Sequence, residues 1–312
     1  MKKPWLFLAC VSCSELALFT QNMSDFKIKL ANKLLTITGY SGSAQDVPIP
    51  DMINGMPVSA IEKEAFYQIP LTRVTIPNSV TFIGKRAFYG TRLTSITIPY
   101  GVISIGEGAF AWTPLTSVTI PYGVRSIGEG AFAWTLLTRV TIPNSVKYLR
   151  ERAFAETLLT SVTIPSYVKY IGTGVFAGCS HLTAITVDVQ NASFSSVDGV
   201  LFSKDMETLI MYPGGKSPHY TIPNSVTSIG RKAFYGTSLT SVTIPDSVTF
   251  IGDFAFASTS LTSVTIPSGV TSIGNFAFAK IQLTSVMIPD SVTSIGKRAF
   301  DDDVKIIRAD LD

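Results

Sequence analysis

A seven-residue phrase, Leu-Thr-Ser-Val-Thr-Ile-Pro, returns with small changes every 22 residues along most of this chain. A fixed period of this length is typical of solenoids, whose units are too short to bury an apolar face alone and therefore stack on their neighbours. The leading leucines are Leu71, Leu93, Leu115, Leu137, Leu159, Leu182, Leu239, Leu261 and Leu283. One phenylalanine closes each of ten units: Phe66, Phe88, Phe110, Phe132, Phe154, Phe176, Phe234, Phe256, Phe278 and Phe300.

Each unit contains two short alternating stretches. Apolar and polar residues alternate over 74–76, as in a strand with one buried face, and Pro77 ends that strand because proline has no N–H to donate. A second stretch runs over 80–83 and ends at Gly84, and residues 85–88 leave room for one helical turn. We therefore predict a mainly β repeat solenoid, a curved right-handed coil with a parallel sheet, short turns and few helices. Ten strands about 4.8 Å apart give a sheet on the order of 45 Å long.

The unit Leu-x-x-Val-x-Ile-Pro-x-x-Val-x-x-Ile-Gly-x-x-Ala-Phe resembles the BspA-like, or Treponema-type, subclass of leucine-rich repeats over roughly residues 47 to 300. The resemblance implies surface or secreted proteins of bacteria and protists that act in adhesion and protein binding. The asparagine ladder of ordinary leucine-rich repeats is replaced by Ser79, Gly101, Gly123, Ser145, Tyr167, Ser225, Ser247, Gly269 and Ser291. Of the closing cysteines of the family only Cys179 remains, and its spacing predicts a small buried residue.

The repeat is interrupted once, since the interval from Phe176 to Phe234 exceeds two units. Within it, Val200–Ser203 and Thr208–Tyr212 flank a turn at 204–205, which predicts a hairpin. The predicted parts are 1–24, an export signal or apolar N-terminal segment; 25–46, an N-terminal β cap; 47–186, a first repeat array; 187–220, an irregular hairpin insertion; 221–300, a second array; and 301–312, a C-terminal cap.

The two ends of the chain carry different signals. Met1 to Cys13 holds two lysines before a short apolar run and resembles a truncated bacterial export signal. Two predictions stay open. The first is export to the cell envelope, in the periplasm or at the surface, with or without a lipid attached to Cys10 or Cys13. The second is a cytoplasmic protein in which this apolar segment packs beneath the cap. No apolar run reaches the roughly 20 residues of a membrane span. The aspartates at 301–303 read as a charged cap rather than a cation site.

Composition and motifs give no support for catalysis. The charged residues make up only 15% of the chain, and 25 basic against 22 acidic residues leave a net charge of +3, too small to steer a nucleic acid. His181 and His219 lie in no metal-ligand or nucleophile motif. Glu107, Glu129 and Glu151 share one repeat position and read as a solvated ladder relieved by Lys85, Arg86 and Arg152. We predict a non-enzymatic protein without a catalytic residue, cofactor or metal.

Binding is the favoured function, because a solenoid displays its non-core positions as a long regular surface. The candidate binding residues are Tyr100, Tyr122, Trp112, Trp134, Arg73, Ser95, Thr97, Ser117, Thr119, Arg139 and Thr141. The tyrosines and tryptophans recur at equivalent positions, so each pair is expected to stack, either to bind a partner or only to stiffen the coil. The first hypothesis is a virulence-associated adhesin for a host or envelope protein. The alternatives are a binding protein for a small apolar or lipid-like molecule and a self-associating structural module.

Overall fold

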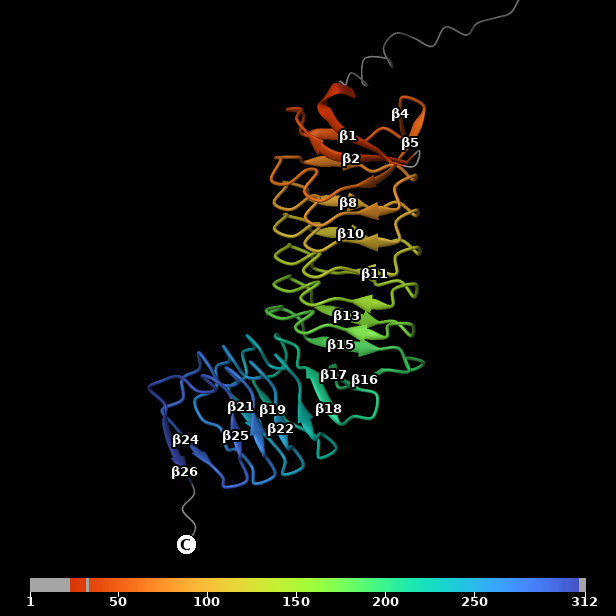
Figure 1. Cartoon of the computed structure of the whole chain (residues 1–312). Helices are drawn as coiled ribbons and strands as arrows, with labels where there is room; N and C mark the ends of the chain where they lie inside the picture. The colour runs from red at the N-terminus through yellow and green to blue at the C-terminus, as the bar shows by residue number, and fades with distance from the viewer. Residues whose placement is uncertain (1–22, 32–33, 309–312) are drawn as a thin grey trace, which may run out of the picture.

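The computed structural model describes residues 23–31 and 34–308 of the chain as a β-solenoid (Figure 1). Coils stack along one axis from the N-terminal end, drawn orange to green, and a second array, drawn teal to blue, continues in another direction. The one helix of the described residues is the single-turn 3-10 helix η2 (Met23–Asp25). No helix of these residues is long and apolar enough to cross a membrane. The predicted export segment, with Cys10 and Cys13, lies outside the described residues except for 23 and 24.

Most coils carry a principal strand and a second strand, as the two alternating stretches predict, while residues 139–141 and 263–265 form no principal strand. The principal strands are β3 (Asp46–Pro48), β6 (Arg73–Thr75), β8 (Ser95–Thr97), β10 (Ser117–Thr119), β13 (Ser161–Ile164), β15 (Ala184–Val187), β19 (His219–Thr221), β21 (Ser241–Thr243), β24 (Ser285–Ile288) and β26 (Lys305–Arg308). The second strands are β5 (Met56–Ile61), β7 (Phe82–Ile83), β9 (Ser104–Ile105), β11 (Ser126–Ile127), β12 (Tyr148–Leu149), β14 (Tyr170–Ile171), β18 (Thr208–Met211), β20 (Ser228–Ile229), β22 (Phe250–Ile251), β23 (Ser272–Ile273) and β25 (Ser294–Ile295).

The longest ladders run along the second strands. One sheet begins with β1 (Phe26–Ala31) and β2 (Leu34–Tyr40) and has the order β1-β2-β5-β7-β9-β11-β12-β14, with β4 (Met52–Ile53) beside β5. The other begins with β16 (Phe194–Val197) and β17 (Val200–Ser203) and has the order β16-β17-β18-β20-β22-β23-β25. The principal strands instead pair two at a time, as in β3–β6 and β8–β10. The prediction of parallel pairing between coils is confirmed, and this pairing is divided among several sheets rather than collected in one. A proline such as Pro99 follows most principal strands within two residues, and it keeps these strands short because it has no N–H to donate.

The core consists of columns of identical side chains. Phe66, Phe88, Phe110, Phe132 and Phe154 are fully buried, and their rings stack on one another at centroid separations of 5.0 to 5.4 Å. A second column in the other array contains Phe234, Phe256, Phe278 and Phe300. Because every ring contacts the coil before and the coil after it, stability comes from interfaces between neighbours, as in other solenoids.

A corner turn, residues 85–90 and their equivalents, replaces the predicted single helical turn. The N–H groups of Arg86 and Phe88 donate to the carbonyls of Glu107 and Ala109 in the following coil at 2.7 and 2.8 Å. Within the turn, the Ala87 N–H donates to the Gly84 carbonyl at 3.3 Å. Arg86 has φ +52°, which a right-handed helical turn does not allow. The helical prediction is wrong because alternate N–H groups are used by the next coil.

The two arrays meet where the repeat is interrupted. The first long sheet ends at β14, and the second begins with β16 (Phe194–Val197), which pairs antiparallel with β17 (Val200–Ser203). β17 in turn pairs antiparallel with β18, at the residues where the sequence predicts a hairpin, and β18 pairs parallel with β20. The buried side chains divide into two main clusters near this junction. The interruption therefore separates two stacks rather than merely bulging from one.

Both ends of the described solenoid carry a strand outside the regular pattern. At the N-terminal end β1 (Phe26–Ala31) and β2 (Leu34–Tyr40) form an antiparallel pair, as the cap prediction requires, while the predicted turn at 32–33 lies outside the described residues. At the other end β26 follows the aspartates at 301–303 and pairs parallel with β24. The predicted strand at 304–307 is therefore present, shifted by one residue.

Candidate binding surface

The principal-strand face of the first array displays most of the candidate residues. In β8 and β10 the flanking serine and threonine of each strand point outward, and Ile96 is buried between Ser95 and Thr97. The strands pair in direct register, so that Ser117 lies opposite Ser95 and Thr119 opposite Thr97. The period of two and the identical units thus produce rows of hydroxyl groups across the coils.

Two hollows interrupt this face. The larger, of about 380 Å³, is lined by Arg73, Ser95, Thr97, Tyr100 and Thr119 over a floor of aliphatic side chains and prolines. The other, of about 290 Å³, is lined by Arg139, Thr141, Ser161, Thr163 and Asp188 among others. Seven of the candidate residues line these hollows, while Ser117, Tyr122, Trp112 and Trp134 line neither. Residues 139–141 form no strand, so the principal strands are interrupted between β10 and β13.

The two tryptophans stack and remain exposed. Their ring centroids are 4.8 Å apart with an interplanar angle of 16°, and 53% of Trp112 and 41% of Trp134 is accessible. Leu136 and Leu158 lie exposed at the equivalent position two residues further on in their coils, with accessible fractions of 46% and 36%. Leu136 follows Trp134 by two residues, and Leu158 occupies the same position one coil further on; we call the stacked pair and these two exposed leucines the apolar ridge. Although the two tryptophan rings stack, much of their surface therefore remains accessible to a partner or to solvent.

The tyrosines behave differently. Tyr100 and Tyr122 are 80% and 70% exposed, and no ring contact joins them. Tyr100 and Tyr122 follow β8 and β10, whereas Trp112 precedes β10 and Trp134 precedes residues 139–141, so the two aromatic pairs lie at opposite ends of the principal-strand face. The expectation that each pair stacks holds for the tryptophans only. Tyr100 lines the larger hollow and Tyr122 does not.

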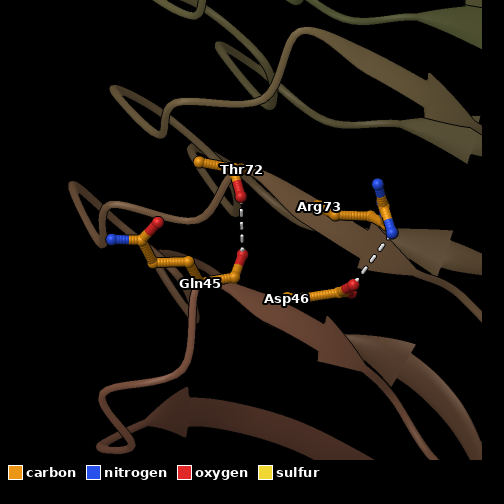
Figure 2. A network of polar contacts seen from close by, with 4 residues as sticks. All are labelled: Gln45, Asp46, Thr72 and Arg73. Carbon is orange, nitrogen blue, oxygen red and sulfur yellow. Dashed lines mark hydrogen bonds and ion pairs between the residues drawn. The ribbon is translucent and has the colours of Figure 1, made fainter.

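Arg73 has a partner inside the protein. Its Nη1 donates to Asp46 Oδ2 at 3.1 Å, and the neighbouring Thr72 hydroxyl donates to the Gln45 carbonyl at 3.3 Å, as Figure 2 shows. Both side chains of the ion pair are largely exposed, at 76% and 54%, so the pair contributes little to stability. Its position joins β6 to β3 at the start of the array, and the arginine is already held when a partner arrives.

Histidine, cysteine and acidic side chains are the groups that could carry out chemistry or hold a metal ion. His181 and His219 are both exposed, and His181 Nδ1 lies 3.2 Å from the neighbouring Ser180 hydroxyl. The described residues contain no group of three or more histidine, cysteine or acidic side chains that could hold a metal ion.

The three stacked glutamates have different surroundings. Glu107 forms an ion pair with Lys85 at 2.8 Å, and Glu129 is exposed. The Tyr170 hydroxyl donates to Glu151, and this bond lowers the pKa of that carboxyl while it raises the pKa of Tyr170. The arrangement is a row of solvated charges rather than a paired-carboxylate site.

Cys179 is 1% exposed, as the spacing predicts. Its thiol donates to the Phe154 carbonyl at 3.2 Å and lies 3.1 Å from the Thr157 hydroxyl, and burial raises its pKa. We expect the thiol to be inert to a water-soluble disulfide reagent at pH 8 in the native protein, because thiolate and access are both lacking. In a Cys10→Ser, Cys13→Ser background, thiol release measured with and without denaturant checks this. Full labelling of the native protein would contradict it.

The fold defines a leucine-rich repeat solenoid that presents a surface rather than a cleft. The family model for the BspA type leucine rich repeat region matches residues 59–198 and 215–311, so the chain belongs to that family. None of the curated proteins compared with the chain matches it.

Three solved structures of bacterial proteins are similar to this chain. The pneumococcal vaccine antigen PcpA is 27% identical with a TM-score of 0.79, covering 90% of this chain and 79% of its own. A leucine rich cell surface protein from Faecalibacterium prausnitzii is 33% identical with a TM-score of 0.68, covering 92% and 94%. A leucine-rich repeat protein from Eubacterium ventriosum is 25% identical with a TM-score of 0.56, covering 91% and 70%.

Proposed function

We propose that this protein is a non-enzymatic binding protein of the bacterial cell surface, which holds a protein partner against the first array. The observation that carries the proposal is the exposed ridge of Trp112, Trp134, Leu136 and Leu158 beside a neutral face of serine and threonine. Exposed tryptophan and tyrosine are the side chains most enriched in binding hot spots, because they bury much surface at a small cost in rotamer entropy. The surface location is supported by the 33% identical cell surface protein.

A protein partner fits this surface better than a small apolar molecule. Both hollows open onto the face, and their rims carry the hydroxyls of Ser95, Thr97, Ser161 and Thr163. Sites for small apolar ligands enclose most of the ligand behind apolar walls. A broad face with an apolar ridge and neutral polar surroundings instead has the composition of a protein–protein interface, whose centre is aromatic and whose rim is polar.

The test uses substitutions that the repeat itself supplies. Trp112 and Trp134 have φ +59° and +60°, and the same corner position holds Gly90, Gly178 and Gly236 elsewhere. Changing both tryptophans to glycine therefore removes the rings without straining the turn. Tyr100 and Tyr122 are changed to asparagine, which stands at the equivalent positions 78 and 144.

A partner is first found by surface plasmon resonance, as a protein that the wild type binds in a panel of purified extracellular-matrix and plasma proteins. We expect the fourfold variant to bind this partner at least about tenfold more weakly than the wild type. Phe254→Gly with Phe276→Gly, which removes the stacked pair in the other array, is the matched control and keeps its affinity. Unchanged affinity of a folded fourfold variant contradicts the proposal. A lipid in an organic extract by mass spectrometry, or concentration-dependent sedimentation, would favour the other two hypotheses.

A further inference from the structure

A second surface, on the second strands of the first array, carries an unusual row of charge. The position just before each second strand holds Thr81, Ile103, Arg125, Lys147 and Lys169 in successive coils of the first array, and Thr227, Thr249, Thr271 and Thr293 in the second array. Threonine is thus the ordinary residue of this position. Three consecutive coils replace it with a cation, and we call Arg125, Lys147 and Lys169 the basic column.

The backbone aligns the basic column strictly. β11, β12 and β14 are parallel neighbours in direct register, with Ser126 opposite Tyr148 and Tyr148 opposite Tyr170. The Lys147 N–H donates to the Arg125 carbonyl at 2.9 Å, and the Lys169 N–H donates to the Lys147 carbonyl at 2.9 Å. All three side chains are exposed. They therefore leave the surface at the spacing of parallel strands, about 4.8 Å, in a straight row along the solenoid axis.

No carboxylate of the described residues neutralises this row. The ion pairs of the described chain join Lys63 to Glu64, Arg73 to Asp46, and Lys85 to Glu107. Glu151, on the coil of Lys147, is held by the Tyr170 hydroxyl. Like charges placed opposite one another destabilise a sheet, so the basic column opposes the pairing that creates it.

The fold itself gains more from threonine at this position. The hydroxyls of Thr249, Thr271 and Thr293 donate to the carbonyl of the same position in the preceding coil at 3.2, 3.1 and 3.3 Å. The cations give up these bonds and add repulsion. Packing within the fold therefore does not account for the three cations. A negatively charged ligand would account for them.

A fourth cation extends the surface. Arg150 stands where neighbouring coils have Gly106, Gly128 and Gly172. Its guanidinium carbon lies 5.2 Å from the ring centroid of Tyr148 and 5.5 Å from that of Tyr170, so it covers both tyrosines beside the basic column. Cation–π contacts of this kind hold the guanidinium in place while leaving its donors available.

We propose that the basic column and Arg150 bind a linear sulfated or carboxylated polysaccharide, which lies along the solenoid axis across the coils of β11, β12 and β14. A straight row of unpaired cations at regular spacing is complementary to a chain with repeating negative charge, and the hydroxyls of Ser126 and Tyr148 are suitable partners for sugar hydroxyls. This surface is separate from the principal-strand face, and the proposal does not depend on a protein partner there.

The surface suits a polysaccharide better than a single-stranded nucleic acid or a membrane. Proteins that bind single strands use free aromatic faces on which bases stack, and here Arg150 lies over the rings of both Tyr148 and Tyr170. Peripheral binding to bilayers combines basic residues with an apolar face that enters the lipid. Beside the column lie Ser126 and the two arginine-covered tyrosines, and the exposed apolar side chains Ile103 and Phe82 lie on the two coils before it rather than along it.

The test replaces the three residues of the basic column with threonine, the residue that the other units have at this position. Arg125→Thr, Lys147→Thr and Lys169→Thr are combined in the full chain, and binding to heparin is measured by isothermal titration calorimetry at several salt concentrations. We expect affinity to fall on the order of 100-fold at low salt and its salt dependence to flatten, since each surface cation contributes about tenfold or somewhat less toward a polyanion. The control Lys280→Ser, Lys297→Asn and Lys305→Ser removes the same charge from the other array and keeps wild-type affinity.

A gain-of-function variant keeps the test independent of folding defects. Thr249→Lys, Thr271→Lys and Thr293→Lys, added to the threefold threonine variant, are expected to restore heparin binding in part, because they rebuild the row on a sheet of the same geometry. Wild-type affinity in the threefold variant, or an equal loss in the control, would overturn the proposal. So would tighter binding of single-stranded DNA of equal charge through the same three residues, which would assign the surface to nucleic acid.

Discussion

Replacing Phe132 with alanine is expected to lower the free energy of unfolding of the first array by about 4 kcal/mol. The ring is fully buried and stacks on Phe110 and Phe154 at 5.4 Å on each side, so its removal opens a cavity between two interfaces at once. The aromatic pairs add to the loss of buried apolar area. Guanidinium unfolding followed by far-UV circular dichroism and by the fluorescence of the nearby tryptophans measures the effect.

The matched control lies two residues further along the same coil. Trp134→Gly removes an even larger ring from an exposed position whose backbone already has a left-handed φ of +60°. Its expected cost is about 1 kcal/mol, the value of one exposed stacked pair. If the two substitutions cost the same, the phenylalanine column is not the main source of cohesion between coils.

Replacing Asn191 with alanine is expected to cost about 3 kcal/mol, because this buried amide satisfies four backbone groups where the repeat is interrupted. Its Nδ2 donates to the Pro165 and Val168 carbonyls at 2.7 and 3.1 Å, and its Oδ1 accepts from the N–H groups of Ser193 and Phe194 at 2.8 and 2.9 Å. The side chain thus joins the last regular coil of the first array to the start of β16. Thermal unfolding and hydrogen exchange of these amides measure the loss.

Two companion variants separate the amide bonds from side-chain size. Asn191→Asp keeps the two acceptor contacts but turns a carboxylate toward two carbonyls, so we expect it to destabilise at least as much as alanine at neutral pH. Gln190→Ala, at the exposed neighbouring position, is expected to change stability by less than about 0.5 kcal/mol. A cost for Asn191→Ala as small as that of the neighbour would show that water replaces the amide.

The columns of the core could be predicted from the sequence because they depend only on the repeat. Once units stack in register, Leu93 must lie over Leu71 and Phe110 over Phe88, and the structure buries all four fully. The buried position of Cys179 follows from the same argument. Predictions of this kind need no knowledge of the backbone path between the columns.

The corner turn could not be predicted from one unit. Residues 85–88 are compatible with a helical turn when considered alone, but the Arg86 and Phe88 N–H groups find partners in the next coil. The number of strands in each sheet could not be predicted from one unit either, because the N–H groups that extend a hydrogen-bond ladder belong to other coils. Which of the two strands forms the longer ladder is decided by interactions that a single repeat does not contain.

The candidate surface shows a similar division. Equivalent spacing predicts that Trp112 and Trp134 meet, and they stack, but it cannot state that Leu136 and Leu158 stay exposed beside them. The basic column was not predicted, although its signal is present in the sequence. It appears when each repeat position is compared across units and the departures from threonine are noted, instead of searching for known motifs.

The direction of the corner-turn bonds gives one edge of the solenoid an electrical polarity, whereas bonds at the second strands, such as that from the Gly106 N–H to the Ile83 carbonyl, run the other way. In every described corner turn that donates to a following coil, alternate N–H groups point toward the C-terminal end, so these peptide dipoles add along the axis with their positive end there. An α-helix has the opposite arrangement. The last corner accordingly favours anions: Asp301 Oδ2 accepts the Lys280 N–H at 2.7 Å, and two more aspartates follow. Asp301, whose charge would be unfavourable at the C-terminal end of a helix, here acts as the electrostatic counterpart of a helix N-cap.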